Sequence, residues 1–141
     1  MSLTTAGAAA AHATLISTTP GNGASLDQAP EQLVLRFDEP VETVSETVRV
    51  FDATGRPIAV GSIEQIGERV IVAKLNDGLP NGTYAVAWRF VSADSHPLRG
   101  AFVFSVGEPL GSVSSVVLAA LASESDSREL DAVQAIARFA A

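Results

Sequence analysis

Residues 13–106 consist of short segments in which apolar and polar residues alternate, and turn-forming residues separate these segments. A period of two places alternate side chains on opposite faces of a β-strand. The clearest example has Tyr84, Val86, Trp88 and Phe90 at one parity. No helical period competes with this pattern. The region therefore predicts an antiparallel sandwich or barrel rather than a sheet built from βαβ units.

Seven segments carry the pattern and predict an all-β fold, an immunoglobulin-like Greek-key sandwich of two sheets. In chain order they are Ala13–Thr18, Leu33–Asp38, Thr47–Asp52, Ile58–Ile63, Arg69–Leu75, Tyr84–Phe90 and Phe102–Val106. Clusters of proline, glycine and asparagine mark the turns between several of them. We expect the aromatic side chains of the sixth segment to anchor the core between the sheets.

Composition narrows the possible functions of the chain. With 141 residues, 47% of them hydrophobic, it can form one domain with a sizeable core. Nine basic against sixteen acidic residues give a net charge of -7, which disfavours binding to nucleic acid or to an anionic membrane surface. Because there is no cysteine, disulfides, thiolate zinc sites and cysteine nucleophiles are excluded.

The two ends of the chain differ in composition from the predicted sandwich. Residues 1–11 are interpreted as an expression start and a signal-peptide remnant, because Ala9–Ala11 matches the small-residue pattern of a signal-peptidase site. Cleavage there would make His12 the first residue of the mature protein. A flexible alanine-rich terminus without consequence is the alternative.

Residues 108–141 are predicted to form a linker and a short amphipathic helix. Apolar side chains recur there at roughly helical spacing, at Leu130, Val133, Ile136 and Phe139. We expect the natural chain to continue beyond this helix into a membrane part. The longest apolar stretch, Val113–Ala122, contains two serines and is too short to cross a bilayer.

The second of the two histidines, His96, follows Asp94 at the end of the aromatic segment. In an extended backbone, residues i and i+2 project to the same side about 6.5 Å apart. This pair can therefore present a carboxylate and an imidazole to one metal ion. Pro97 favours the extended geometry because it biases the preceding residue away from helical dihedral angles. An exposed carboxylate hydrogen-bonded to a surface histidine is the alternative.

A free amino group on His12 would add two nitrogen donors, the amine and the imidazole. The amine titrates near pH 7.7–8.0, so a metal ion can displace its proton at modest cost. Two imidazoles, one amine and one carboxylate form a tetragonal set of nitrogen and oxygen donors. Such a set favours Cu(II) over zinc and nickel.

Three motifs together resemble the CopC family of copper-binding proteins: His12–Leu15, the turn Thr19–Ala24, and Asp94–Pro97 followed by Gly100–Phe104. The resemblance covers residues 12–107. It implies a periplasmic or cell-surface β-sandwich that holds one Cu(II) in a histidine brace. The implied ligands are His12, through its amine and imidazole, Asp94 and His96, with the carboxylate either ligating or holding the imidazole in place.

The resemblance also implies delivery of copper to a CopD-like membrane protein, which is sometimes fused in the same chain. Residues 108–141 resemble the link that precedes such a membrane part. Some relatives carry a methionine-rich Cu(I) site, but here the only methionine is Met1. We therefore expect a member that binds Cu(II) alone. Any residue left before His12 converts its amine to an amide and weakens the site.

The sequence thus predicts an extracytoplasmic protein that sequesters copper, confers copper tolerance or supplies a membrane importer. A non-enzymatic function is expected, without a small-molecule substrate, because no general acid and base pair and no cofactor motif is present. Two alternatives stay open. A histidine-brace copper monooxygenase would need an axial tyrosine near the metal and an exposed aromatic face for its substrate. Tyr84, the only tyrosine, is expected in the core instead. A metal-free immunoglobulin-like adhesion module would leave Asp94 and His96 without a role.

Overall fold

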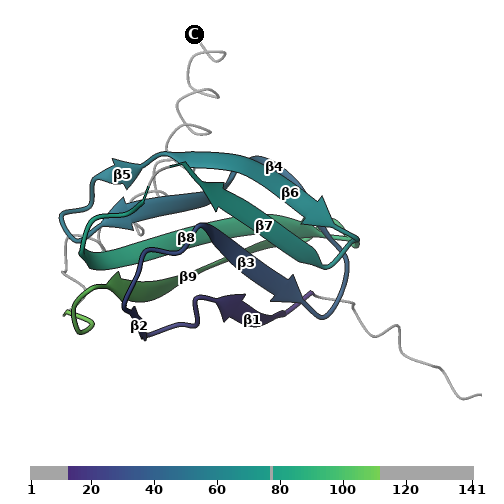
Figure 1. Ribbon diagram of the computed structural model, residues 1–141. Helices are drawn as coiled ribbons and strands as arrows, with labels where there is room; N and C mark the ends of the chain where they lie inside the picture. Colours follow the sequence, from purple (N-terminus) through teal and green to yellow (C-terminus); the bar gives the residue numbers. More distant parts are fainter. Residues whose placement is uncertain (1–12, 77, 112–141) are drawn as a thin grey trace, which may run out of the picture.

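The computed structural model describes residues 13–76 and 78–111, and all regular elements within these ranges are β-strands (Figure 1). The strands are β1 (Leu15–Thr19), β2 (Ala24–Leu26), β3 (Gln32–Phe37), β4 (Val41–Asp52), β5 (Pro57–Ile58), β6 (Val60–Ile66), β7 (Val70–Leu75), β8 (Gly82–Ser92) and β9 (Pro97–Val106). The prediction of an all-β sandwich is confirmed. The predicted C-terminal helix lies outside the described residues.

Two sheets pack face to face. One has the strand order β1-β3-β7-β6, and the other has the order β2-β9-β8-β4-β5. Neighbouring strands are antiparallel except for β2, which runs parallel to β9. No helix in the described part of the chain is long and apolar enough to span a membrane.

The core lies between the sheets and consists of the side chains that the long strands direct inward. Phe37 of β3 contacts Phe90 and Trp88 of β8 edge to face, with ring centroids 5.0 and 5.6 Å apart. These contacts join the two sheets, because β3 and β8 belong to different ones. Tyr84, Val86 and Phe90 are buried as predicted, whereas Trp88 is partly buried against the core.

The structure extends the predicted strands at places where alternation is absent. β4 begins at Val41, six residues before the predicted start, because its exposed polar first half carries no apolar parity. The strand β2 was not predicted, since three residues cannot display a period, and the single predicted segment Ile58–Ile63 spans the end of β5 and the start of β6, which belong to different sheets. β9 begins at Pro97, which pairs with Val91 across the hairpin.

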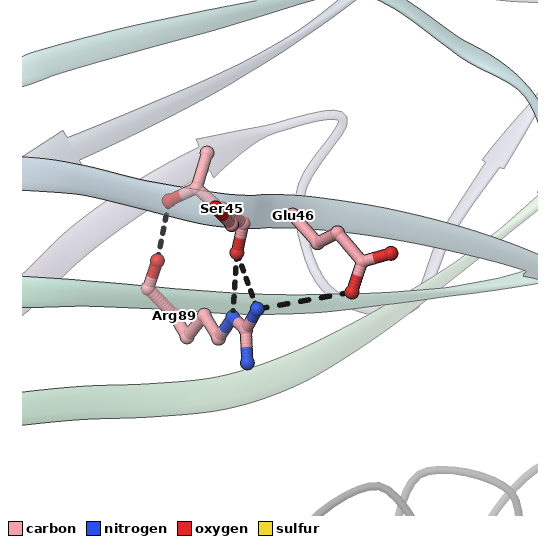
Figure 2. Close-up of polar contacts among 4 residues, drawn as sticks. Ser45, Glu46 and Arg89 are labelled. Carbon is pink, nitrogen blue, oxygen red and sulfur yellow. Dashed lines mark hydrogen bonds and ion pairs between the residues drawn. The ribbon is translucent and has the colours of Figure 1, made fainter.

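A β-bulge interrupts the pairing of β4 with β8 between Thr43 and Val48, and Arg89 holds it in place (Figure 2). The Arg89 guanidinium donates two hydrogen bonds to the backbone carbonyl of Ser45, one of them 3.0 Å long. Its Nη2 also lies 3.8 Å from a carboxylate oxygen of Glu46, whose φ is 53°. The bulge thus brings a positive-φ residue and an arginine together on the outside of this sheet.

Candidate metal site

The candidate site lies on the hairpin that joins β8 to β9. The N–H of Ser92 donates to the carbonyl of His96 (2.9 Å), and the N–H of Ser95 donates to the carbonyl of Ser92 (2.9 Å). Ser95 has a φ of 69°, so the three-residue loop 93–95 ends in a left-handed residue. The prediction of an extended backbone at Asp94 is therefore wrong, because this residue lies within the turn.

The turn nevertheless brings the two predicted side chains into contact. Nδ1 of His96 lies 2.8 Å from Oδ2 of Asp94. Both side chains reach solvent, with 58% of the imidazole and 29% of the carboxylate exposed. The two side chains thus lie side by side, as their spacing predicted, although a tight turn rather than strand alternation places them together.

The buried side chain of Ser92 fixes the position of the Asp94 carboxylate. Its side chain is 1% exposed, and its hydroxyl donates a hydrogen bond to Oδ1 of Asp94. The hydroxyl oxygen of Ser92 in turn accepts a hydrogen bond from the backbone N–H of His96 (3.3 Å). Because one carboxylate oxygen is held by the serine, the other is directed toward the imidazole. Sequence reasoning missed this role, although Ser92 shares the inward parity of Phe90 and this signal could have revealed it.

The hydrogen bond from Ser92 also sets the charge of the site. It is the largest cause of the low pKa of Asp94, about 2 against an ordinary value of 3.8, and the contact with His96 lowers that pKa further. The carboxylate is therefore ionised throughout the physiological pH range. An ionised carboxylate beside an imidazole is a suitable pair of donors for a divalent metal ion.

The separation of these donors fits a shared metal ion. Two ligand atoms about 2.0 Å from one ion, at a right angle, are about 2.8 Å apart. The contact between Nδ1 of His96 and Oδ2 of Asp94 has this length, which is also that of an ordinary hydrogen bond, so the metal-free pair matches the alternative of a surface histidine hydrogen-bonded to a carboxylate. Within residues 13–76 and 78–111, however, no group of three metal-ligating side chains occurs. The described part of the chain therefore brings together two of the three predicted ligands.

The start of the described chain lies at the same end of the sandwich as this hairpin. The N–H of Thr14 donates to Oδ1 of Asp38 (2.6 Å), and the N–H of Asp38 donates to the carbonyl of Thr14 (3.0 Å). Three residues later Val41 pairs with Ser92. Figure 1 shows the beginning of β1 and the turn after β8 on the right side of the view.

The third predicted ligand, His12, lies outside the described residues. Its neighbour Ala13 is buried, with 5% of its surface exposed, and belongs to the core cluster. This anchoring fixes where the chain enters the fold. Asp38, which holds Thr14, was not identified from the sequence as part of this end, because its partner is 24 residues away.

A two-sheet sandwich with a carboxylate and imidazole pair on its β8–β9 hairpin defines a class of β-sandwich domain with two candidate metal ligands. Comparison with known proteins specifies the class further. The CopC domain model matches residues 15–107. The chain therefore belongs to the CopC family.

Individual relatives agree with this assignment. The chain is 34% identical over 107 residues to the copper transport protein CutJ of Bacillus subtilis, a match that covers 74% of this chain and 20% of that protein. The present chain thus spans about one fifth of the length of CutJ. Membership of the CopC family associates the chain with copper and with binding rather than with enzymatic catalysis.

Solved structures show the same fold. The crystal structure of CopC from Methylosinus trichosporium OB3b superposes with a TM-score of 0.60 at 25% identity, covering 71% of this chain and all of that one. PcoC, a methionine-rich copper resistance protein from Escherichia coli, gives a TM-score of 0.60 at 30% identity and covers 68% and 99% of the two chains. The present chain differs from a methionine-rich protein, since its only methionine is Met1.

Proposed function

We propose that this protein binds one Cu(II) ion through His12, Asp94 and His96. The observation that supports the proposal best is the 2.8 Å contact between the Asp94 carboxylate and the His96 imidazole on a hairpin that shares one end of the sandwich with the start of β1. In this proposal His12 contributes its amine and its imidazole. The resulting nitrogen and oxygen donors favour Cu(II) over softer Cu(I).

The biological role that follows is copper sequestration or supply. We place the protein outside the cytoplasm, in the periplasm or on the cell surface, where a processed amino terminus would be available. From there it would hold copper or pass it to a CopD-like membrane transporter. The match to one fifth of the length of a copper transport protein supports this arrangement.

Calorimetric titration of Cu(II) into two forms of the protein tests the proposal. One form is the full chain, and the other begins at a free His12. Each titration includes a competing chelator so that tight binding can be measured. We expect one equivalent to bind at least about 100-fold more tightly to the trimmed form, because only that form has the terminal amine.

Variants of the trimmed form identify the other ligands. Asp94→Ala and His96→Ala should each weaken binding by about 100-fold or more. Glu64→Gln, on the exposed face of the edge strand β6, is a matched control that removes a surface carboxylate elsewhere. If neither form binds copper beyond the level of a generic surface site, the copper proposal fails and a metal-free adhesion module becomes the better account.

A further inference from the structure

The outer face of the five-stranded sheet carries apolar side chains where an exposed sheet face is normally polar. Phe51, Ala85 and Val103 form a continuous row across β4, β8 and β9, because Phe51 pairs with Ala85 and Ala85 pairs with Val103. Ala87 continues the same parity along β8. We call these four residues the outer apolar face.

Two members of this face are buried and the other two, Ala87 and Val103, are half-buried, which indicates that part of it is covered. Phe51 is 3% exposed and Ala85 is 2% exposed, yet neither belongs to the core cluster between the sheets. The guanidinium of Arg49 lies 5.2 Å from the centre of the Phe51 ring and covers part of it. An arginine over one ring does not account for the row that continues through Ala85 to Val103.

The chain beyond β9 turns onto this same face. The hydroxyl of Ser105 donates to the carbonyl of Glu108 (2.7 Å), and the N–H of Gly111 donates to the hydroxyl of Thr83 (3.0 Å). Thr83 pairs with Ser105, and both side chains point to the outer face of the sheet. They lie two residues along their strands from Ala85 and Val103. The described chain therefore ends on the outer face, beside the apolar row.

The charges on the face complement those of the chain that follows. Arg89 and Arg99 lie directly opposite each other on β8 and β9, and like charges in this arrangement repel. Arg49 adds a third positive charge on β4, and Glu46 offsets one of the three through its contact with Arg89. The chain beyond residue 111 has four acidic residues, Glu124, Asp126, Glu129 and Asp131, against two basic ones, Arg128 and Arg138, and apolar residues at Leu130, Val133, Ile136 and Phe139.

We propose that residues 112–141 of the same chain dock on the outer face of the five-stranded sheet. Their apolar side chains cover the outer apolar face, and their carboxylates approach Arg89 and Arg99. Reach does not limit this arrangement, since the twelve residues 112–123 can extend over about 40 Å and β8 from Thr83 to Arg89 spans about 20 Å. The inference does not depend on copper, because the candidate metal site lies at the hairpin end of β8.

Paramagnetic relaxation in the full chain tests the docking. Because the protein has no cysteine, Gln134→Cys introduces a single position for a nitroxide label. We expect strong loss of amide signal intensity at Ala85, Ala87 and Ala101, on β8 and β9. The amide of Val72, on β7 in the other sheet, serves as the internal control and should keep its intensity.

A second variant tests the apolar contact without disturbing the sandwich. Ile136→Asp combined with Phe139→Asp, in the labelled chain, should restore the signals of β8 and β9, because two apolar contacts with the outer apolar face are lost while no residue of the described strands is changed. Equal loss at Val72 and Ala85, or no loss at either, overturns the proposal. A sample that mixes isotope-labelled chain with separate spin-labelled chain should show no loss. Loss in that mixture would mean that the segment of a second copy occupies the face.

Discussion

The indole of Trp88 lies against the backbone of Gly100, its register partner on the neighbouring strand β9. A Cβ atom on Gly100 would lie 2.5 Å from Cζ2 and 2.8 Å from Cε2 of the indole. The indole can therefore cross β9 only where β9 has no side chain. This arrangement also holds the edge-to-face contact between Trp88 and Phe37, which joins the two sheets.

Replacing Gly100 by alanine should destabilise the domain by about 1–3 kcal/mol, because the indole must move out of well-packed surroundings. Urea unfolding followed by Trp88 fluorescence measures the change. Gly21→Ala is the matched control, since a Cβ there meets nothing within 4 Å and its φ is not positive. Equal stability of the two variants would contradict the close packing described for Trp88.

Removing the Ser92 hydroxyl should weaken the metal site without unfolding the protein. Ser92→Ala leaves Oδ1 of Asp94 without its donor, so we expect the pKa of Asp94 to rise and copper binding by the trimmed form to weaken about 10-fold. Carboxyl NMR titration and calorimetry measure the two effects. Ser45→Ala, at an exposed serine whose backbone carbonyl makes the contact with Arg89, should change neither.

The low pKa of Asp94 predicts a specific acid dependence of stability in the metal-free protein. Because the pKa in the folded state, about 2, lies below the ordinary value of 3.8, the carboxylate contributes its full stability above pH 3.8. This contribution is lost as the pH falls from 3.8 through 2. The difference in unfolding free energy between the parent protein and Asp94→Asn should therefore shrink over this interval.

Asp52 provides the comparison for that measurement. The hydroxyl of Thr54 lowers the pKa of Asp52 in the turn after β4, so this group also stabilises the folded state above its ordinary pKa. Asp52→Asn should reduce part of the loss of unfolding free energy at acid pH while leaving copper affinity unchanged. A pH profile of Asp94→Asn that parallels the parent protein down to pH 2 would show that Asp94 is not the titrating group.

Tyr84→Phe should separate stability from copper binding. The Tyr84 hydroxyl donates to the carbonyl of Pro80 (2.6 Å), and burial raises the pKa of this phenol above its ordinary value of 10.0. Loss of the hydrogen bond should cost about 1 kcal/mol in thermal or urea unfolding. Copper affinity should not change, because Tyr84 and the Ser92 hairpin lie toward opposite ends of β8. A weaker copper affinity would indicate coupling along the strand.

Much of the sandwich could be predicted because β-strand alternation is a local property. The parity of Tyr84, Val86 and Phe90 determines which side chains face the core, whatever the strands pair with. The candidate pair Asp94 and His96 was visible for a similar reason, since two residues separated by one position remain close in almost any backbone conformation. Neither inference needs knowledge of distant residues.

The tertiary structure alone determined how these parts meet. Thr14 lies beside Asp38, and Val41 lies beside Ser92, only because the strands pair in a particular register, and that register depends on contacts between residues far apart in the chain. The turn that brings the Asp94 carboxylate to His96 depends on the left-handed Ser95 and on hydrogen bonds from a buried serine. Side-chain parity is repeated along each strand, whereas pairing register is satisfied only by the folded chain as a whole.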